Sequence, residues 1–193
     1  MHSLIANAPD ARYWVAPDSF PIDAKGLTVC EAPWHGVIRL QGSDRDAEFG
    51  RRAAGVLGLE LPAACRSANQ GELTAVWVSP NERLIFCPIA QEASLVTQLR
   101  QALAECFATV TLVTDSRVGY EIRGNQATEF LAKGCSLDLD PSVFATGSVA
   151  ITRFATLNCM VYRERSNAYR LYFDISYQSF VLSWILDAAA EWQ

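Results

Sequence analysis

The 193-residue sequence is poor in histidine, in positive charge and in long apolar runs. Its only histidines are His2 and His35, so a histidine-centred acid/base pair or a multi-histidine metal site is hard to build. The formal net charge of −5 disfavours a protein that binds nucleic acid by neutralising phosphates. Apolar runs such as residues 181–190 are shorter than the roughly 20 residues needed to cross a bilayer. These shortages argue against most hydrolases, nucleic-acid-binding proteins and membrane proteins.

Common motifs for nucleotides, zinc and secretion are also missing. Neither G-x-G-x-x-G nor G-x-x-x-x-G-K-[ST] occurs, so these motifs give no support for nucleotide or flavin binding. The six cysteines are widely spaced, whereas zinc ligands normally lie two to four residues apart. In a reducing compartment we expect most of them to be small buried hydrophobes. The start, residues 1–5, lacks the basic and apolar regions of a signal peptide, so we expect a cytoplasmic protein.

What is present is the balance of an ordered globular protein, with 50% hydrophobic and 19% charged residues. Residues 1–33 differ from the rest, because they are rich in Pro, Asp and Ala and hold no long helical or strand period. We expect a partly irregular N-terminal arm there. Its isolated aromatic residues, Tyr13, Trp14 and Phe20, either fold back on the core of the chain or anchor it to a partner.

From residue 34 onward the hydrophobic periodicity predicts alternating strands and helices. Strands are expected at residues 37–40, 73–78, 83–87, 109–113, 118–123, 148–154, 158–163 and 169–173. Helices are expected at residues 44–58, 91–107, 125–133 and 176–192. Ser43 is the expected cap of the first helix, Phe107 is expected on the apolar face of the second, and Gly134 is expected at a helix end with positive φ. This order predicts an α+β fold with mostly antiparallel sheets and helices packed on them.

The two halves of the chain also resemble each other. Residues 38–43 match residues 120–125 at the end of a strand, and the Leu-acid-Leu segment 59–62 returns at 137–141. We therefore expect residues 34–193 to form a single compact unit of two split βαβ-like pseudo-repeats, about 34–115 and 116–193. Chance similarity between two amphipathic β-α units is the alternative.

Several segments resemble the gamma subunit of heterotetrameric sarcosine oxidase. The sharpest is Lys133-Gly134-Cys135-Ser136-Leu137-Asp138-Leu139. Other matching segments are Thr114-Asp115-Ser116-Arg117, Tyr120-Glu121-Ile122-Arg123-Gly124, Thr152-Arg153, Ser176-Tyr177 and Trp184-Ile185-Leu186-Asp187-Ala188, with looser matches at Leu57-Gly58-Leu59 and Trp77-Val78-Ser79-Pro80-Asn81-Glu82. The resemblance covers most of residues 37–190. Because that family is similar to the folate-binding domain of the glycine cleavage T-protein, it implies a duplicated α+β fold.

The resemblance implies a role within a larger complex. In such oxidases the alpha subunit carries NAD and tetrahydrofolate sites, the beta subunit carries FAD, FMN lies between these two, and the delta subunit binds zinc. The gamma subunit contributes no recognised catalytic residue to the oxidative demethylation of sarcosine. Two alternatives stay open: a subunit of a related N-methyl amino acid oxidase or dehydrogenase, and a free-standing folate-dependent one-carbon transfer protein.

Few residues of the chain are candidates for chemistry. Cys135 follows an expected helix end, where the negative end of the helix dipole raises a thiol pKa, so it is a poor nucleophile. Asp115 is the one candidate for the carboxylate that folate-dependent relatives use, but we favour a turn or cap for Asp115-Ser116. We therefore predict no catalytic, cofactor-binding or metal-binding residue in this chain.

Arginines and tryptophans of the second half are candidates for partner contacts. The arginines fall mainly on expected strands and turns, where they either pair with carboxylates of a partner or lie on a solvated sheet edge; they are Arg117, Arg123, Arg153, Arg163, Arg165 and Arg170. Trp184 fits the apolar stripe of the last helix. Trp192 is either an interface residue or frayed.

Overall fold

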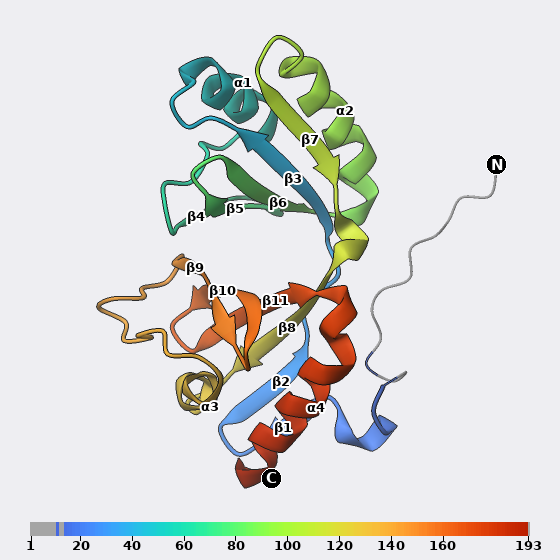
Figure 1. Cartoon of the computed structure of the whole chain (residues 1–193), viewed down its shortest axis with the longest axis vertical. Coiled ribbons are helices and arrows are strands. Elements are labelled where there is room, and N and C mark those ends of the chain that lie inside the picture. The colour runs from blue at the N-terminus through green and yellow to red at the C-terminus, as the bar shows by residue number, and fades with distance from the viewer. Residues whose placement is uncertain (1–10, 12–13, 193) are drawn as a thin grey trace, which may run out of the picture. The chain divides into compact units, whose positions relative to one another are not determined.

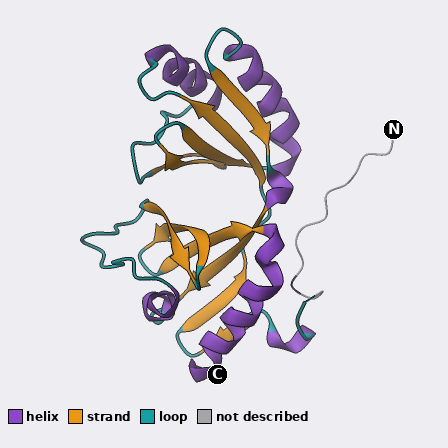
Figure 2. Ribbon diagram, in the orientation of Figure 1, coloured by secondary structure: helices purple, strands orange, loops and turns teal. Residues whose placement is uncertain are grey.

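The computed structural model describes Ala11 and residues 14–192, and it divides into two compact units. Unit 2 comprises Trp34–Thr114 with Gly147–Ala150, and unit 1 comprises the remainder of the described chain. Each unit has an antiparallel sheet with helices packed against it (Figures 1 and 2). The predicted α+β class with antiparallel sheets is confirmed. The chain leaves unit 2 at Thr114, one residue before the predicted end of the first pseudo-repeat.

Unit 2 is a five-stranded sheet carrying two helices. Its sheet has the order β4-β5-β6-β3-β7. The elements are β3 (Gly36–Gly42), α1 (Ala47–Leu57), β4 (Ser67–Gln70), β5 (Leu73–Ser79), β6 (Glu82–Cys87), α2 (Glu92–Ala102) and β7 (Ala108–Leu112). The core forms because alternate strand residues such as Ile38 and Ile85 meet the apolar stripes of α1 and α2, which include Phe49 and Leu99.

Unit 1 is a six-stranded sheet with the order β1-β2-β8-β11-β10-β9. Its elements are β1 (Ile22–Ala24), β2 (Leu27–Glu31), β8 (Arg117–Arg123), α3 (Ala127–Gly134), β9 (Val149–Phe154, which unit 1 holds from Ile151), β10 (Leu157–Arg165), β11 (Ala168–Asp174) and α4 (Gln178–Ala189). Aromatic side chains dominate its interior. Phe154 packs edge-on against both Phe173 and Trp184, with ring centroids 5.9 and 4.7 Å apart.

The two units repeat one plan. The order β4-β5-β6-β3-β7 in unit 2 corresponds strand by strand to β9-β10-β11-β8-β2 in unit 1. The same backbone hydrogen bond recurs at equivalent positions, from Gly42 N to Asn81 O and from Gly124 N to Asn167 O, each 3.0 Å long. Buried residues of the second helix also correspond, since Leu95 and Leu99 of α2 match Val181 and Ile185 of α4. These matches support a duplication.

The N-terminal segment differs from the expected arm. Residues 1–10 and 12–13 lie outside the described residues, but β1 and β2 are strands of the unit 1 sheet. β2 pairs with β8 as β7 pairs with β3, so it occupies the place of the last strand of the repeat. The N-terminal segment therefore supplies the strand of unit 1 that corresponds to β7 of unit 2. Phe20 correspondingly folds back and packs edge-on against Tyr120, 6.1 Å between ring centroids.

Three local expectations are corrected. The cap of α1 is Asp46 rather than Ser43, because the Asp46 carboxylate accepts hydrogen bonds from the backbone of Glu48 and Phe49. Gly134 is the last residue of α3 and has no positive φ; a Cβ there would lie 2.4 Å from the Phe154 ring, so close packing accounts for this glycine. The expected helix 91–107 ends at Ala102, which places Phe107 in the loop before β7, with 99% of its surface exposed.

Candidate functional site

The candidate catalytic residues are not brought together. Cys135 is buried beyond the end of α3, and burial raises the pKa of its thiol. Asp115 is exposed in the 3-10 turn Thr114–Ser116. It therefore lies in a turn, as its neighbour Ser116 led us to expect. His35 belongs to unit 2, where its ring lies edge-on to Phe86 at 6.3 Å, and His2 lies outside the described residues.

Three of the candidate interface arginines, Arg123, Arg163 and Arg170, have acceptors within unit 1. Arg170 donates to Glu164 at 2.8 Å and lies 3.3 Å from Glu121, and Arg123 also pairs with Glu121. Arg163 is buried and donates to three backbone carbonyls. Arg153 and Arg165 are exposed. Arg163 and Arg170 are therefore corrected from partner-binding candidates to internal residues, because their guanidinium groups already have acceptors in the same unit.

Both units use a buried arginine to hold the segment that follows their first helix. In unit 1, Arg163 Nη1 donates to Leu139 O at 3.1 Å and to Phe144 O at 2.6 Å. In unit 2, Arg83 donates to Pro62 O at 3.2 Å and forms an ion pair with Asp44 at 2.7 Å. Sequence reasoning did not single out Arg83. The repeated segments 59–62 and 137–141 were the available signal, since each contains a backbone carbonyl that a buried arginine binds.

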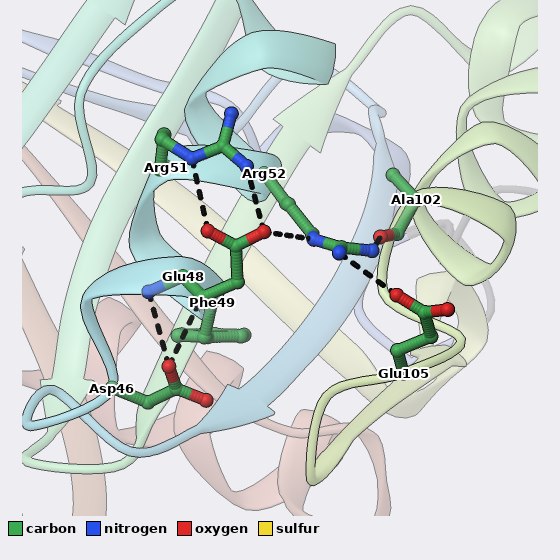
Figure 3. A network of polar contacts seen from close by, with 7 residues as sticks. All are labelled: Asp46, Glu48, Phe49, Arg51, Arg52, Ala102 and Glu105. Carbon is green, nitrogen blue, oxygen red and sulfur yellow. Dashed lines mark hydrogen bonds and ion pairs between the residues drawn. The ribbon is translucent and has the colours of Figure 1, made fainter.

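A polar network joins the two helices of unit 2 (Figure 3). The Glu48 carboxylate accepts from Arg51 at 2.6 Å and from Arg52 at 2.5 Å, and these two guanidiniums lower the pKa of Glu48 to about 2. Arg52 reaches onward to α2, donating to Ala102 O at 3.1 Å and to Glu105 at 2.9 Å. The network therefore fixes the end of α2 against α1.

Unit 1 contains the equivalent clamp at the end of its own second helix. Lys133 Nζ of α3 donates to Ala188 O at 2.7 Å and pairs with Glu191 at 2.6 Å. It also lies 4.3 Å from the ring centroid of Trp192. Ala188 and Glu191 stand where Ala102 and Glu105 stand in unit 2. Trp192 is thus held inside unit 1, where its ring also packs edge-on against Phe130.

Each unit has a surface hollow beside this clamped helix end. The hollow of unit 2 has a volume of about 420 Å3 and is lined by Gln41, Gly42, Ser43, Asn81, Cys106, Phe107, Ala108 and Thr109. The hollow of unit 1 has a volume of about 570 Å3 and is lined by Lys25, Gly26, Asn125, Gln126, Glu191 and Trp192. The lining of the unit 2 hollow carries no charged side chain, so it offers hydrogen bonds and apolar contact rather than acid/base catalysis.

Two other classes of site are absent from the described residues. They contain no cluster of three or more His, Cys, Asp or Glu side chains placed to hold a metal ion. They also contain no helix whose length and apolar character would let it cross a membrane.

Solved structures with this architecture place the chain in a fold class. A chain of aminomethyltransferase T of the glycine cleavage system from Bartonella henselae superposes with a TM-score of 0.61 at 12% identity, over 84% of this chain and 46% of that chain. A chain of the heterotetrameric sarcosine oxidase from Corynebacterium sp. U-96, in complex with pyrrole 2-carboxylate, superposes with a TM-score of 0.86 at 21% identity, over 97% of this chain and 96% of that chain. The fold is therefore the duplicated α+β fold that these proteins share.

Sequence comparison defines the family within that class. The model of the sarcosine oxidase gamma subunit family matches residues 39–191. The sarcosine oxidase subunit gamma of Corynebacterium sp. (strain U-96) is 27% identical over 140 residues, which are 72% of this chain and 67% of that protein. The chain belongs to the sarcosine oxidase gamma subunit family, and the predicted resemblance is confirmed.

Proposed function

We propose that this chain is the non-catalytic gamma subunit of a cytoplasmic heterotetrameric sarcosine oxidase. The match of the family model over residues 39–191 is the observation that carries the proposal. The partners are the alpha, beta and delta subunits, which hold FAD, FMN, NAD, tetrahydrofolate and zinc, and the gamma chain holds none of these. Its contribution is to support an assembly that oxidatively demethylates sarcosine and passes the one-carbon unit to tetrahydrofolate.

Features of the two units support a structural role. The candidate carboxylate Asp115 has no histidine near it in sequence, the Cys135 thiol is buried with a raised pKa, and the unit 2 hollow has an uncharged lining. By contrast, the hydrogen bonds of Arg52, Lys133 and Arg163 hold helices and loops in place. Such networks stabilise a scaffold and do not activate a substrate.

Co-expression of the tagged chain with the other three subunits from the same organism tests the proposal. We expect a four-subunit complex with flavin absorbance and sarcosine-dependent electron transfer. Activity with another N-methyl amino acid, and none with sarcosine, would assign the chain to a related oxidase or dehydrogenase. Purification of the chain alone, without flavin and with tetrahydrofolate binding by calorimetry, would replace the proposal with an independent one-carbon transfer protein.

A further inference from the structure

The loop before β7 in unit 2 combines a fully exposed aromatic side chain with a surface hollow. Phe107 is 99% exposed, and it lies on the rim of the 420 Å3 hollow. Full exposure of a phenyl ring forgoes about 1.5–3 kcal/mol that burial would supply. Exposed aromatic side chains beside a hollow are typical anchors of protein interfaces.

Because the two units repeat one plan, the hollow of unit 2 can be compared with the corresponding hollow of unit 1. In unit 1 the corresponding hollow is lined by the indole of Trp192, held there by Lys133 and Phe130. The corresponding place in unit 2, one residue after Glu105, holds the much smaller Cys106. At the position equivalent to Trp192, unit 2 therefore has a small side chain, and the aromatic side chain beside its hollow is Phe107 on the rim.

The free edge of β7 indicates how a partner approaches. In unit 1 the equivalent strand β2 is covered by β1, whereas no described strand pairs with the outer side of β7. Val113 N bonds Val37 O, so by alternation the carbonyl of Val110 points away from β3. Arg100 donates to this carbonyl at 2.9 and 3.1 Å. One backbone acceptor in the middle of the edge is thus already bonded, which disfavours addition of a partner strand and leaves the Phe107 end as the contact.

The lining of the hollow specifies the occupant. None of its side chains is charged, and most of its polar groups are already bonded: Gln41 donates to Glu82 at 3.1 Å and accepts from Thr109 at 3.0 Å, and Ser43 accepts from Arg45 N at 3.2 Å. The lining itself supplies no ion-pair partner for a charged side chain and few free hydrogen-bonding groups, whereas an aromatic or aliphatic side chain on a partner loop would be accommodated.

We propose that Phe107 and the adjoining hollow of unit 2 form the surface by which this chain docks on another subunit of its complex. The occupant is a loop of that subunit that inserts an aromatic or aliphatic side chain into the hollow, while Phe107 enters an apolar socket on the partner. This inference rests on the proposed function as a subunit.

The test is co-expression of tagged variants with the other three subunits, followed by quantitation of the assembled complex by native mass spectrometry. Phe107→Asp is expected to reduce assembly at least tenfold, whereas Phe180→Asp, a substitution at a 49% exposed phenylalanine of α4, keeps wild-type assembly. Thr109→Trp fills the hollow and is expected to reduce assembly. Thr111→Trp, on the same strand but outside the hollow, serves as its matched control.

The thermal midpoint of each isolated chain separates docking from folding, and Phe107→Asp is expected to leave it unchanged because the side chain is exposed. Wild-type assembly by Phe107→Asp or Thr109→Trp overturns this inference alone. Self-association of the wild-type chain that Phe107→Asp abolishes also overturns it, because the occupant is then a second copy. Failure of the wild-type chain to join the other subunits overturns the proposed function and this inference with it.

Discussion

Arg163 binds three backbone carbonyls of unit 1 and so fixes the loops to which they belong. Its guanidinium donates to Leu139, Phe144 and Ser166 and lies 5.2 Å from the ring centroid of Tyr169. Hydrogen bonds to a charged group are each worth about 1.5–3 kcal/mol in mutational series. A buried carbonyl that loses such a donor keeps its desolvation cost without compensation.

Substitution of Arg163 by Ala is therefore expected to lower the free energy of unfolding by about 2–4 kcal/mol. Hydrogen exchange of residues 139–146 should accelerate, because their anchor is gone. The matched control is Arg165→Ala, which removes an exposed guanidinium two residues away and should stay within about 0.5 kcal/mol. Urea unfolding of both variants checks the prediction, and equal stability would contradict an anchoring role for Arg163.

Glu48 is a second residue whose charge state the fold controls. Hydrogen bonds from Arg51 and Arg52 favour its ionised form and lower its pKa from 4.5 to about 2. Because the folded pKa is depressed, the stabilisation is present above the ordinary pKa and is lost as pH falls from about 4.5 through about 2.

We expect a carboxyl carbon NMR titration of Glu48 to give a midpoint near 2. Arg52→Gln should move that midpoint upward, since it removes one of the two hydrogen-bonding guanidiniums. A midpoint at the ordinary value in the unsubstituted protein would show that the two guanidiniums do not bind this carboxylate in solution.

The start of helix α1 is set by the one polar side chain that reaches the free amides of its first turn. Ser43, Asp44 and Asp46 all precede the apolar stripe, and each is a residue type that caps helices. Only the Asp46 carboxylate reaches the free amides of the first turn, at 3.0 Å from Glu48 N and 3.3 Å from Phe49 N. Ser43 instead accepts a hydrogen bond from Arg45 N in the preceding turn, and Asp44 pairs with Arg83.

Asp46→Ala is expected to lower the free energy of unfolding by about 1 kcal/mol, because two amides at the start of α1 lose their acceptor. Ser43→Ala should change it by less than about 0.5 kcal/mol. Thermal or urea unfolding distinguishes the two, and a larger effect at Ser43 would restore it as the cap.

Among the elements, long periodic segments were predictable and short or polar ones were not. The strands at residues 37–40, 118–123 and 169–173 were found because they alternate, with every second side chain in a core. Strand β4 was missed because Ser67-Ala68-Asn69-Gln70 has no apolar alternation. Strand β2 does alternate, with Leu27 and Val29 buried, but it is short and lies among Pro, Gly and Asp residues.

At the scale of the whole molecule, the N-terminal segment is the part whose role changes most. As an arm it would be dispensable for folding. As the source of β1 and β2 it completes a sheet and contributes the buried side chains of Ile22, Leu27 and Val29.

Deletion of residues 1–33 is therefore expected to lower the thermal midpoint sharply or to prevent recovery of soluble protein, since it exposes the edge of β8 and opens the core of unit 1. The single substitution Val29→Asp should act in the same direction, whereas Asp23→Asn on the exposed side of β1 should not. Circular dichroism melts measure both effects. An unchanged midpoint after the deletion would support the expectation that residues 1–33 are an arm that folding does not require.

The sequence alone determined the class of fold and the family, because periodicity and motifs such as Lys133–Leu139 are local in the chain. Only the tertiary structure decided that β2 completes the sheet of unit 1 and that Arg163 bonds to carbonyls in its interior. It also decided that α2 ends before Phe107, which is exposed. These outcomes depend on partners far apart in sequence, such as β2 with β8 and Arg163 with Leu139. No window of neighbouring residues encodes such pairings, since they exist only once the chain has folded.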